Sequence, residues 1–340
     1  MAHQIDTTTG KAAIAYAGET PWHGLGQKMQ PGMTTEQWRE AAGLGYGIES
    51  APVEFTLPGT AEVKAYPKRR VLLRDDTKTP LSIVSDDYKI VQPAEVLDFF
   101  GKLAEIGGFE LEVAGALMGG SRIWGLARVN DEANIIGQDA VRPYLLLATS
   151  YDGMMATTAK FTAIRVVCNN TLTMSVGGFM GAGKTEADTE GKAVSSLVKV
   201  PHSATFDPDA VRQQLGIVKN VFERWVVETK ILAERALTDA EADAFLKTLL
   251  PEPYAPKGEA KRPVETTRGY AKIMDLFHGK AIGAELTGGP TAWAMLNAVT
   301  EWVDHDRSSN ANNRMNAAWF GPGDQLKTRA NTLLRQLVAA

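Results

Sequence analysis

The segment from Tyr144 to Val167 constrains the fold more than any other part of the sequence. Two β-prone arms, rich in aliphatic, β-branched and aromatic residues, flank the dipeptide Asp152-Gly153. Asp-Gly is a favoured two-residue hairpin turn, because both positions tolerate a positive φ. The segment therefore predicts a long antiparallel β-hairpin at the centre of the chain.

Short β-prone runs separated by turn signals extend over the rest of the first half. Pro93 is expected to open a helix over 94–106, which Gly107-Gly108 ends. Thr34 or Thr35 is expected to cap a shorter helix through Gln37 to Ala42. Further strands are expected at 53–57, 70–74, 81–84, 109–116, 122–129 and 142–149.

The second half has helical spacing. Apolar and small side chains from Val211 to Ala236 alternate at intervals of four and three, which is a heptad seam. Gly216 and Thr229 interrupt this seam and favour packing inside the monomer over a free coiled coil. Thr238 and Glu241 form a capping box for the next helix. Further helices are expected at about 266–278, 291–304 and 323–338.

These patterns predict an α+β fold, with a strand-rich mixed N-terminal half around a central antiparallel hairpin and a helical C-terminal half. We expect a β-rich α+β domain at 1–176, a Gly-rich flexible loop and connector at 177–206, and a helical region at 207–340 that packs on the first domain.

Composition indicates an ordinary globular protein. Hydrophobic residues make up 44% of the 340 residues and charged residues 22%. No apolar run approaches the roughly 18–20 residues that a membrane span needs. The polar N-terminus lacks the features of a signal peptide, and the single cysteine, Cys168, excludes an internal disulfide framework. We therefore expect a cytoplasmic protein without contact to a membrane.

The net charge of -4 disfavours a protein that coats duplex DNA by bulk charge, but it leaves room for a local basic groove. Small basic clusters are the alternative to scattered surface charge. The candidate nucleic-acid-binding residues are Lys68, Arg69, Arg70, Lys160, Arg165, Arg307 and Arg314.

Two of these, Lys160 and Arg165, accompany Phe161 on the return arm of the hairpin. Basic and aromatic residues together on a sheet can bind single-stranded nucleic acid by phosphate contact and base stacking. Strand alternation places Lys160 on the face opposite Phe161 and Arg165, which weakens this interpretation.

A stretch of the sequence matches a phosphate-binding loop by spacing alone. Residues 178–185 read G-x-x-x-x-G-K-T, but the segment that follows is acidic, contains a glycine and has no apolar face. A flexible loop that matches by chance is the favoured interpretation, and no cofactor is expected.

Three further candidates have a functional and a structural interpretation. Glu301, Asp304 and His305 share a helix face and have the residue types of a divalent-metal site, or they cap the helix and form salt bridges. Trp22-His23 forms a functional loop pair or, as we favour, a structural plug. Cys168 has no histidine near it in the sequence and is expected to be a small buried hydrophobe.

Several phrases together resemble the uncharacterised phage/plasmid-like protein family, which is encoded on phages, prophages and conjugative plasmids. The resemblance extends over nearly the whole chain, although the family usually has His where Tyr151 stands and the Gly-rich stretch at 178–185 looks like an insertion. The matching phrases are Thr20–Gly26, Tyr144–Leu147, Ser150–Gly153, Ile164–Leu172, Asn297–His305 and Ala318–Gly321.

The family has no established activity, and its setting implies a role in phage or plasmid biology. The leading hypothesis is an accessory protein that binds or anneals single-stranded DNA in recombination or replication and forms a homo-oligomer. One alternative is a host-takeover or anti-defence factor that binds phage or host proteins without catalysis. The other is a metal- or nucleotide-dependent enzyme.

Overall fold

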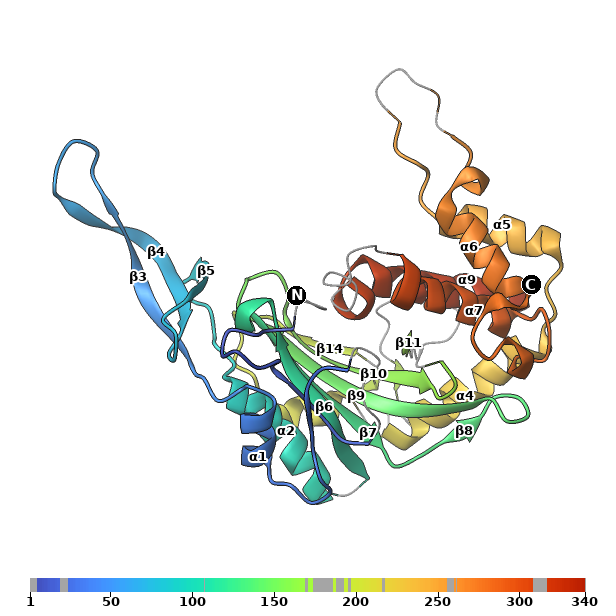
Figure 1. Ribbon diagram of the computed structural model, residues 1–340, viewed down its shortest axis with the longest axis horizontal. Helices are drawn as coiled ribbons and strands as arrows, with labels where there is room; N and C mark the ends of the chain where they lie inside the picture. Colours follow the sequence, from blue (N-terminus) through green and yellow to red (C-terminus); the bar gives the residue numbers. More distant parts are fainter. Residues whose placement is uncertain are drawn as a thin grey trace. The chain divides into compact units, whose positions relative to one another are not determined.

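The computed structural model confirms an α+β fold with an antiparallel sheet in the N-terminal half and helices in the C-terminal half (Figure 1). It describes residues 5–18, 24–106, 108–168, 171–173, 186–187, 193–194, 197–215, 218–255, 260, 262–307 and 317–339. The chain forms two compact units, each made of separate segments. The first unit comprises 1–130, 144–160 and 197–215, and the second comprises 131–143, 161–196 and 216–340.

An extended sheet organises the first unit. Its strands lie in the order β2-β1-β6-β7-β9-β10, and β14 pairs with the first residues of β10. All of the pairs β1–β6, β6–β7, β7–β9 and β10–β14 are antiparallel, whereas β1 and β2 are parallel. The strands are β1 Ile14–Tyr16, β2 Gln27–Lys28, β6 Phe109–Leu117, β7 Arg122–Val129, β9 Ala140–Ser150, β10 Thr157–Arg165 and β14 Leu197–Val200.

The predicted hairpin is present as β9 and β10, but the two-residue turn is wrong. The strands are joined by the six residues 151–156, with Gly153 at φ 71°. The Asp152 carboxylate accepts hydrogen bonds from Arg122 Nε at 2.6 Å and from the Met154 amide at 2.9 Å. Tyr151 is fully buried and donates to the Val91 carbonyl at 2.8 Å. Side-chain contacts outside the dipeptide therefore set the loop.

Helix α2, Pro93–Ile106, packs against β6 and β7 and confirms the expected helix at 94–106. Its buried Phe100 lies so close to the sheet that a Cβ at Gly125 would sit 2.4 Å from the ring. Helix α1, Thr35–Ala41, begins with the Thr34–Gln37 capping box, and α3, Pro208–Leu215, packs near β14. These helices pack on the sheet and bury apolar residues of one of its faces.

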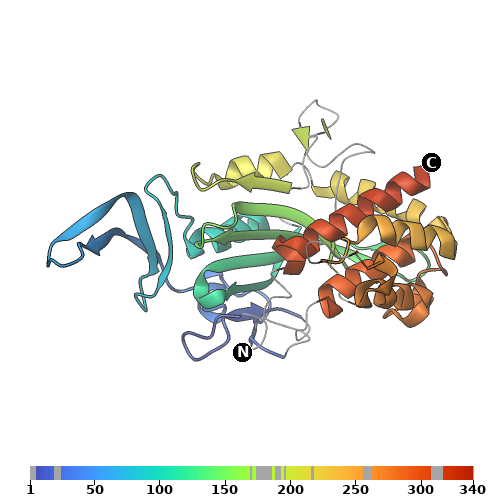
Figure 2. The same cartoon turned by 90° about the horizontal axis from the view of Figure 1, so that it is seen from above.

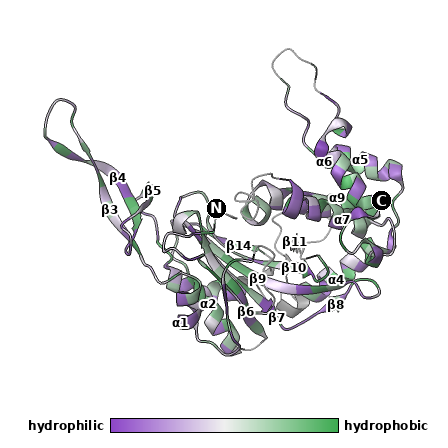
Figure 3. Cartoon of the chain, in the orientation of Figure 1, coloured by the Kyte–Doolittle hydropathy of each residue, from purple (hydrophilic) through white to green (hydrophobic). Residues whose placement is uncertain are grey.

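A second, three-stranded sheet forms an arm of the first unit. Strands β3, Ile48–Thr56, and β4, Val63–Arg74, pair as a long hairpin, and β5, Pro80–Ser85, pairs with the inner part of β4 (Figure 1). Every side chain from 63 to 69 is exposed. Hydrophobic and hydrophilic residues are interspersed along both long strands (Figure 3). The outer half of this arm therefore has no core of its own.

The second unit is a helical bundle around α7, which is buried along its whole length (Figures 1 and 2). Helices α4, α6 and α9 pack on α7, and α5 packs on α9. The helices are α4 Val218–Glu234, α5 Asp239–Leu249, α6 Arg268–Asp275, α7 Ala292–Glu301 and α9 Pro322–Ala339; α6 and α7 continue into π-helical turns at Leu276–Lys280 and Trp302–Asp306. Short 3₁₀ turns lie at Met118–Gly120 in the first unit and at Val264–Thr266 and Ala284–Leu286 in the second.

The heptad seam packs inside the monomer, as expected. Phe222, Trp225, Thr229 and Leu232 are buried in α4, and the Trp225 ring meets Trp293 of α7 edge-on at 6.5 Å. The seam is not one continuous helix, since α3 ends at Leu215 and α4 begins at Val218. The Thr238–Glu241 capping box at the start of α5 is confirmed.

Short strands complete the second unit. β8 pairs with the first residues of β9, and β11 pairs with the last residues of β10. The strands are β8 Ala133–Asn134, β11 Thr171–Thr173, β12 Glu186–Ala187 and β13 Ala193–Val194. None of the helices in the described ranges has the length and apolar character to cross a membrane.

Candidate nucleic-acid interface

A large bulge interrupts β4 in the outer half of the arm. Pro52 pairs with Arg70 and Glu54 pairs with Ala65, so the four residues 66–69 lie opposite Val53 alone. Lys68 within the bulge has φ 54°, in the left-handed region that side chains rarely adopt. Bulges re-aim side chains and are common beside functional sites. This bulge presents an exposed aromatic ring, Tyr66, next to two exposed cations, Lys68 and Arg69.

The two cations of the bulge differ from their neighbours in β4. Lys64 forms an ion pair with Glu62 at 3.4 Å, and Arg70 donates to Ser50 Oγ at 3.1 Å and to the Asp86 carbonyl. The side chains of Lys68 and Arg69 form no hydrogen bond or ion pair with any residue that the structure describes. Residues 52–70 hold four basic and two acidic side chains, so the outer arm is locally basic on an acidic protein.

The inner end of β4 is fixed by a buried cation. Arg74 is fully buried, its Nη1 lies 2.5 Å from Asp6 and its Nη2 lies 2.7 Å from Asp76. The guanidinium also stacks over the Tyr46 ring at 3.8 Å. The hydrogen bond from Arg74 lowers the pKa of the Asp76 carboxyl. This anchor ties the inner end of β4 to Asp6 and Tyr46 of the first unit.

A groove of about 470 Å³ lies beside the bulge, within the first unit. Arg69 lines it from the bulge, Ser85 from β5, Met154 from the loop between β9 and β10, and Ser203 from the segment after β14. Among the described residues that line the groove, Arg69 is the one permanent cation and there is no carboxylate. Such a lining favours an anionic ligand.

Two aromatic rings form the wall of this groove. Tyr88 and His202 stack with their ring centroids 4.3 Å apart and their planes 12° from parallel. The Tyr88 hydroxyl donates to the Ser150 carbonyl at 2.5 Å. Both His202 nitrogens lie near carbonyl oxygens, Nδ1 at 3.0 Å from Lys89 and Nε2 at 3.2 Å from Met155. The polar edges of both rings are thus engaged within the protein.

The predicted basic residues that the structure describes are divided between the two units. Lys68, Arg69 and Arg70 lie in β4, whereas Lys160 is buried in β10 with 8% of its surface exposed. Arg307 belongs to the second unit and stacks over Trp302 at 5.7 Å. Arg314, Trp22, His23 and the loop 178–185 lie outside the described residues.

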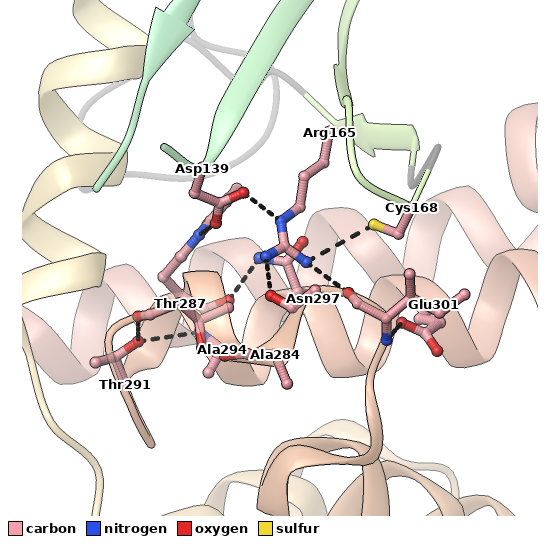
Figure 4. Close-up of polar contacts among 12 residues, drawn as sticks. Asp139, Arg165, Cys168, Ala284, Thr287, Thr291, Ala294, Asn297 and Glu301 are labelled. Carbon is pink, nitrogen blue, oxygen red and sulfur yellow. Dashed lines mark hydrogen bonds and ion pairs between the residues drawn. The ribbon is translucent and has the colours of Figure 1, made fainter. Parts of the chain in front are cut away.

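Arg165 is part of a buried polar cluster in the second unit (Figure 4). Its Nε donates to Asp139 Oδ1 at 2.7 Å, and the other Asp139 oxygen accepts from Trp293 Nε1 at 2.8 Å. Arg165 also donates to the carbonyls of residues 282 and 283 at 3.0 and 2.7 Å. Both charged side chains are fully buried, so Arg165 joins three segments of the unit and does not face solvent.

Cys168 and Glu301 border this cluster (Figure 4). Cys168 is buried, as expected, with its Sγ 3.8 Å from Arg165 Nη1. Burial raises the pKa of the Glu301 carboxyl, which accepts a hydrogen bond from the Ile282 amide at 3.1 Å. The contact of Cys168 with Arg165 and that of Glu301 with the Ile282 amide both join segments of the second unit.

Asp304 belongs to a second buried cluster. Its Oδ1 lies 2.8 Å from Lys327 Nζ, and its Oδ2 accepts from the amide and hydroxyl of Thr171 at 2.8 and 2.7 Å. The carboxylates of Glu301 and Asp304 thus form hydrogen bonds with different partners. Among the described residues, no group of three His, Cys, Asp or Glu side chains is placed to hold a metal ion. The geometry favours the structural interpretation of Glu301, Asp304 and His305.

Sequence reasoning missed Tyr66, Tyr88 and His202. Tyr66 could have been found from the sequence, because this aromatic residue lies close to the basic residues at 68–70. Tyr88 and His202 are 114 positions apart, and only the fold brings them together. No local signal predicts that pair.

The fold and the site define an α+β protein with a basic, aromatic β-ribbon beside an acid-free groove. Residues 80–320 match the family model described as a domain of unknown function, DUF932, and the chain belongs to this family. The match includes the groove residues from Ile83 to Ser203, and the bulge at 66–69 precedes it. No curated protein and no solved structure matches the chain.

Proposed function

We propose that the protein binds single-stranded nucleic acid along the outer arm and the groove beside it. The bulge at 66–69 carries the proposal, because it exposes Tyr66, Lys68 and Arg69 together on a strained backbone. Proteins that bind single strands combine cations that follow the backbone with aromatic rings on which bases stack.

Further aromatic and apolar side chains on the arm support a stacking surface. Tyr66 is 54% exposed and Phe55 is 43% exposed, and Phe55 lies directly opposite Lys64 in the ribbon. Opposite residues of an antiparallel pair share one face. A ring and a cation therefore lie side by side on the outer arm, next to the bulge.

The test is fluorescence anisotropy with a labelled single-stranded 40-mer, measured over a series of salt concentrations. The double variant Lys68→Gln/Arg69→Gln is compared with Lys247→Gln/Lys280→Gln, which removes two exposed charges from the second unit. Each phosphate contact contributes about 0.7 to the slope of log affinity against log salt for single strands. The arm variant is expected to lose about 1.4 of this slope, and the control is expected to retain it.

Two results would overturn the proposal. One is no anisotropy change with wild-type protein at micromolar concentration and low salt. The other is equal affinity and equal salt slope for the arm variant and the control. An affinity capture that then returned a phage or host protein would favour the protein-interaction alternative.

The resemblance to phage- and plasmid-encoded proteins supports a finer proposal. We infer a cytoplasmic accessory role in recombination or replication, in which a homo-oligomer anneals complementary single strands. A fluorescence-transfer assay with two complementary oligonucleotides is expected to show faster annealing with wild-type protein than with the arm variant. Equal rates with both proteins would remove annealing from the proposal and leave binding in place.

A further inference from the structure

We propose that the groove beside the bulge is a base slot: one nucleobase stacks on the Tyr88–His202 pair and its phosphate lies at Arg69. This inference rests on the proposed function, since the base belongs to the strand that the arm binds. It adds a defined subsite and a ligand class, an aromatic base joined to a phosphate.

The geometry of the Tyr88–His202 stack suits the addition of a third aromatic ring. Hydrogen bonds occupy the Tyr88 hydroxyl and place both His202 nitrogens at carbonyl oxygens, which leaves the π-faces as the recognition surface. The two rings are already nearly parallel, at 12°. A platform that is fixed before binding loses little conformational entropy when a base stacks on it.

The groove also has the size and lining that a nucleotide unit needs. Its volume of about 470 Å³ falls within the roughly 300–1,000 Å³ of small-molecule sites. Met154 is 78% exposed and Met155 lies next to it, both lining the groove. Methionine side chains adapt to different shapes and contact aromatic rings favourably. The methionines let the groove accommodate bases of different shapes, and Ser85 and Ser203 add hydroxyl groups to its lining.

The charges at and near the slot favour a phosphate at Arg69. Arg69 is the permanent cation of the lining and has no ion-pair partner among the described residues, so it is available to a phosphate. The nearest acid of the β9–β10 loop, Asp152, is paired with Arg122 at 2.6 Å. A phosphate at Arg69 therefore meets little repulsion from that loop.

The test compares a thymine oligonucleotide with an abasic oligonucleotide of the same length, which keeps the phosphates and lacks the bases. Tyr88→Leu removes the ring, and Tyr254→Leu is the matched control, because Tyr254 is 88% exposed in the second unit. Tyr88→Leu is expected to weaken thymine binding roughly 5- to 100-fold, the range for loss of one base stack. It is expected to leave abasic binding unchanged, and Tyr254→Leu is expected to change neither.

A second variant does not depend on a buried hydrogen bond. Met154→Asp places a carboxylate in the groove at an exposed position, and Val227→Asp places one at an exposed position on α4. The first is expected to weaken thymine binding at low salt, and the second is expected to leave it unchanged.

The outcomes separate the base slot from the wider proposal. Salt-dependent binding of both oligonucleotides, with Tyr88→Leu equal to Tyr254→Leu and Met154→Asp equal to Val227→Asp, would overturn the slot and retain the function. Absence of oligonucleotide binding by wild type would overturn both. Calorimetry with free thymidine monophosphate distinguishes the source: binding that Tyr88→Leu abolishes, without any strand affinity, would make the site one for free nucleotides and overturn the proposal.

Discussion

The outer arm of the first unit and the Arg165 cluster of the second unit use the same side chain in opposite ways. Arg69 is exposed on a bulge and has no ion-pair partner among the described residues. Arg165 is fully buried, pairs with Asp139 and donates to two carbonyls. A cation without a partner is available to a ligand, whereas a cation that is fully paired holds segments together.

Removing the acid of the buried pair is expected to have the largest effect. Asp139→Ala leaves the Arg165 guanidinium buried without its counter-ion and removes the acceptor of Trp293 Nε1. Breaking a buried ion pair on one side costs about 3–5 kcal/mol of unfolding free energy. Chemical denaturation measures this loss, with Asp131→Ala, an exposed acid nearby, as the control. A loss below about 1 kcal/mol would contradict the buried pair, since that is the range of an exposed one.

The Asp304–Lys327 cluster is expected to respond asymmetrically. Asp304→Ala leaves the buried Lys327 ammonium with oxygens of Thr171 alone, and is expected to cost about 3 kcal/mol. Lys327→Met is expected to cost less, because Met fills the volume of the lysine stem, whereas Ala leaves a cavity, and Asp304 Oδ2 keeps both donors of Thr171. Denaturation of the two variants side by side gives the order of the losses. Equal losses would show that Thr171 does not support the carboxylate.

Neutralising the bulge is expected to change binding and spare stability. Lys68→Gln/Arg69→Gln removes no side-chain hydrogen bond or ion pair among the described residues, so its unfolding free energy is expected to stay within about 0.5 kcal/mol of wild type. Thermal melts measure this, next to the anisotropy series. If Lys68→Gln/Arg69→Gln lost as much unfolding free energy as Asp139→Ala, the outer arm and the Arg165 cluster would not differ in the way described.

The pH dependence of the Arg74 anchor is the smallest expected effect. The folded pKa of Asp76 is lowered by its hydrogen bond from Arg74, so its contribution is fully present above the unfolded pKa, near 3.9. That contribution is lost as the pH falls through the lower, folded pKa. The stability difference between wild type and Asp76→Asn is therefore expected to shrink below about pH 4. A difference that is constant from pH 6 to pH 2 would contradict the anchor.

Local signals in the sequence predicted elements better than they predicted the site. The helix cap at Thr34, the capping box at Thr238 and the helix after Pro93 are encoded within a few residues, and all are confirmed. The two-residue turn at Asp152 was wrong: the loop runs from 151 to 156, and the Asp152 carboxylate pairs with Arg122, thirty positions away. No local signal marks a distant partner of this kind.

The sequence also does not reveal which of the basic residues are exposed at the surface. Arg69 and Arg165 are both arginines in strands near aromatic residues, and the sequence does not tell which one meets water. Alternation also failed as a guide to β10, because Lys160, Phe161 and Arg165 are all buried. The bulge that exposes Lys68 arises from register with β3, which is a property of the paired strands.

The division of the chain has a consequence for experiments that dissect it. β9 and β10 each contribute residues to both units, and each unit is assembled from three separate stretches of sequence. No single truncation yields either unit intact, so truncated variants are unsuited to mapping activities onto them. A cut between Ser150 and Thr157, by contrast, leaves every strand whole. The two fragments are candidates for reassembly in a complementation assay, with oligonucleotide binding as the readout.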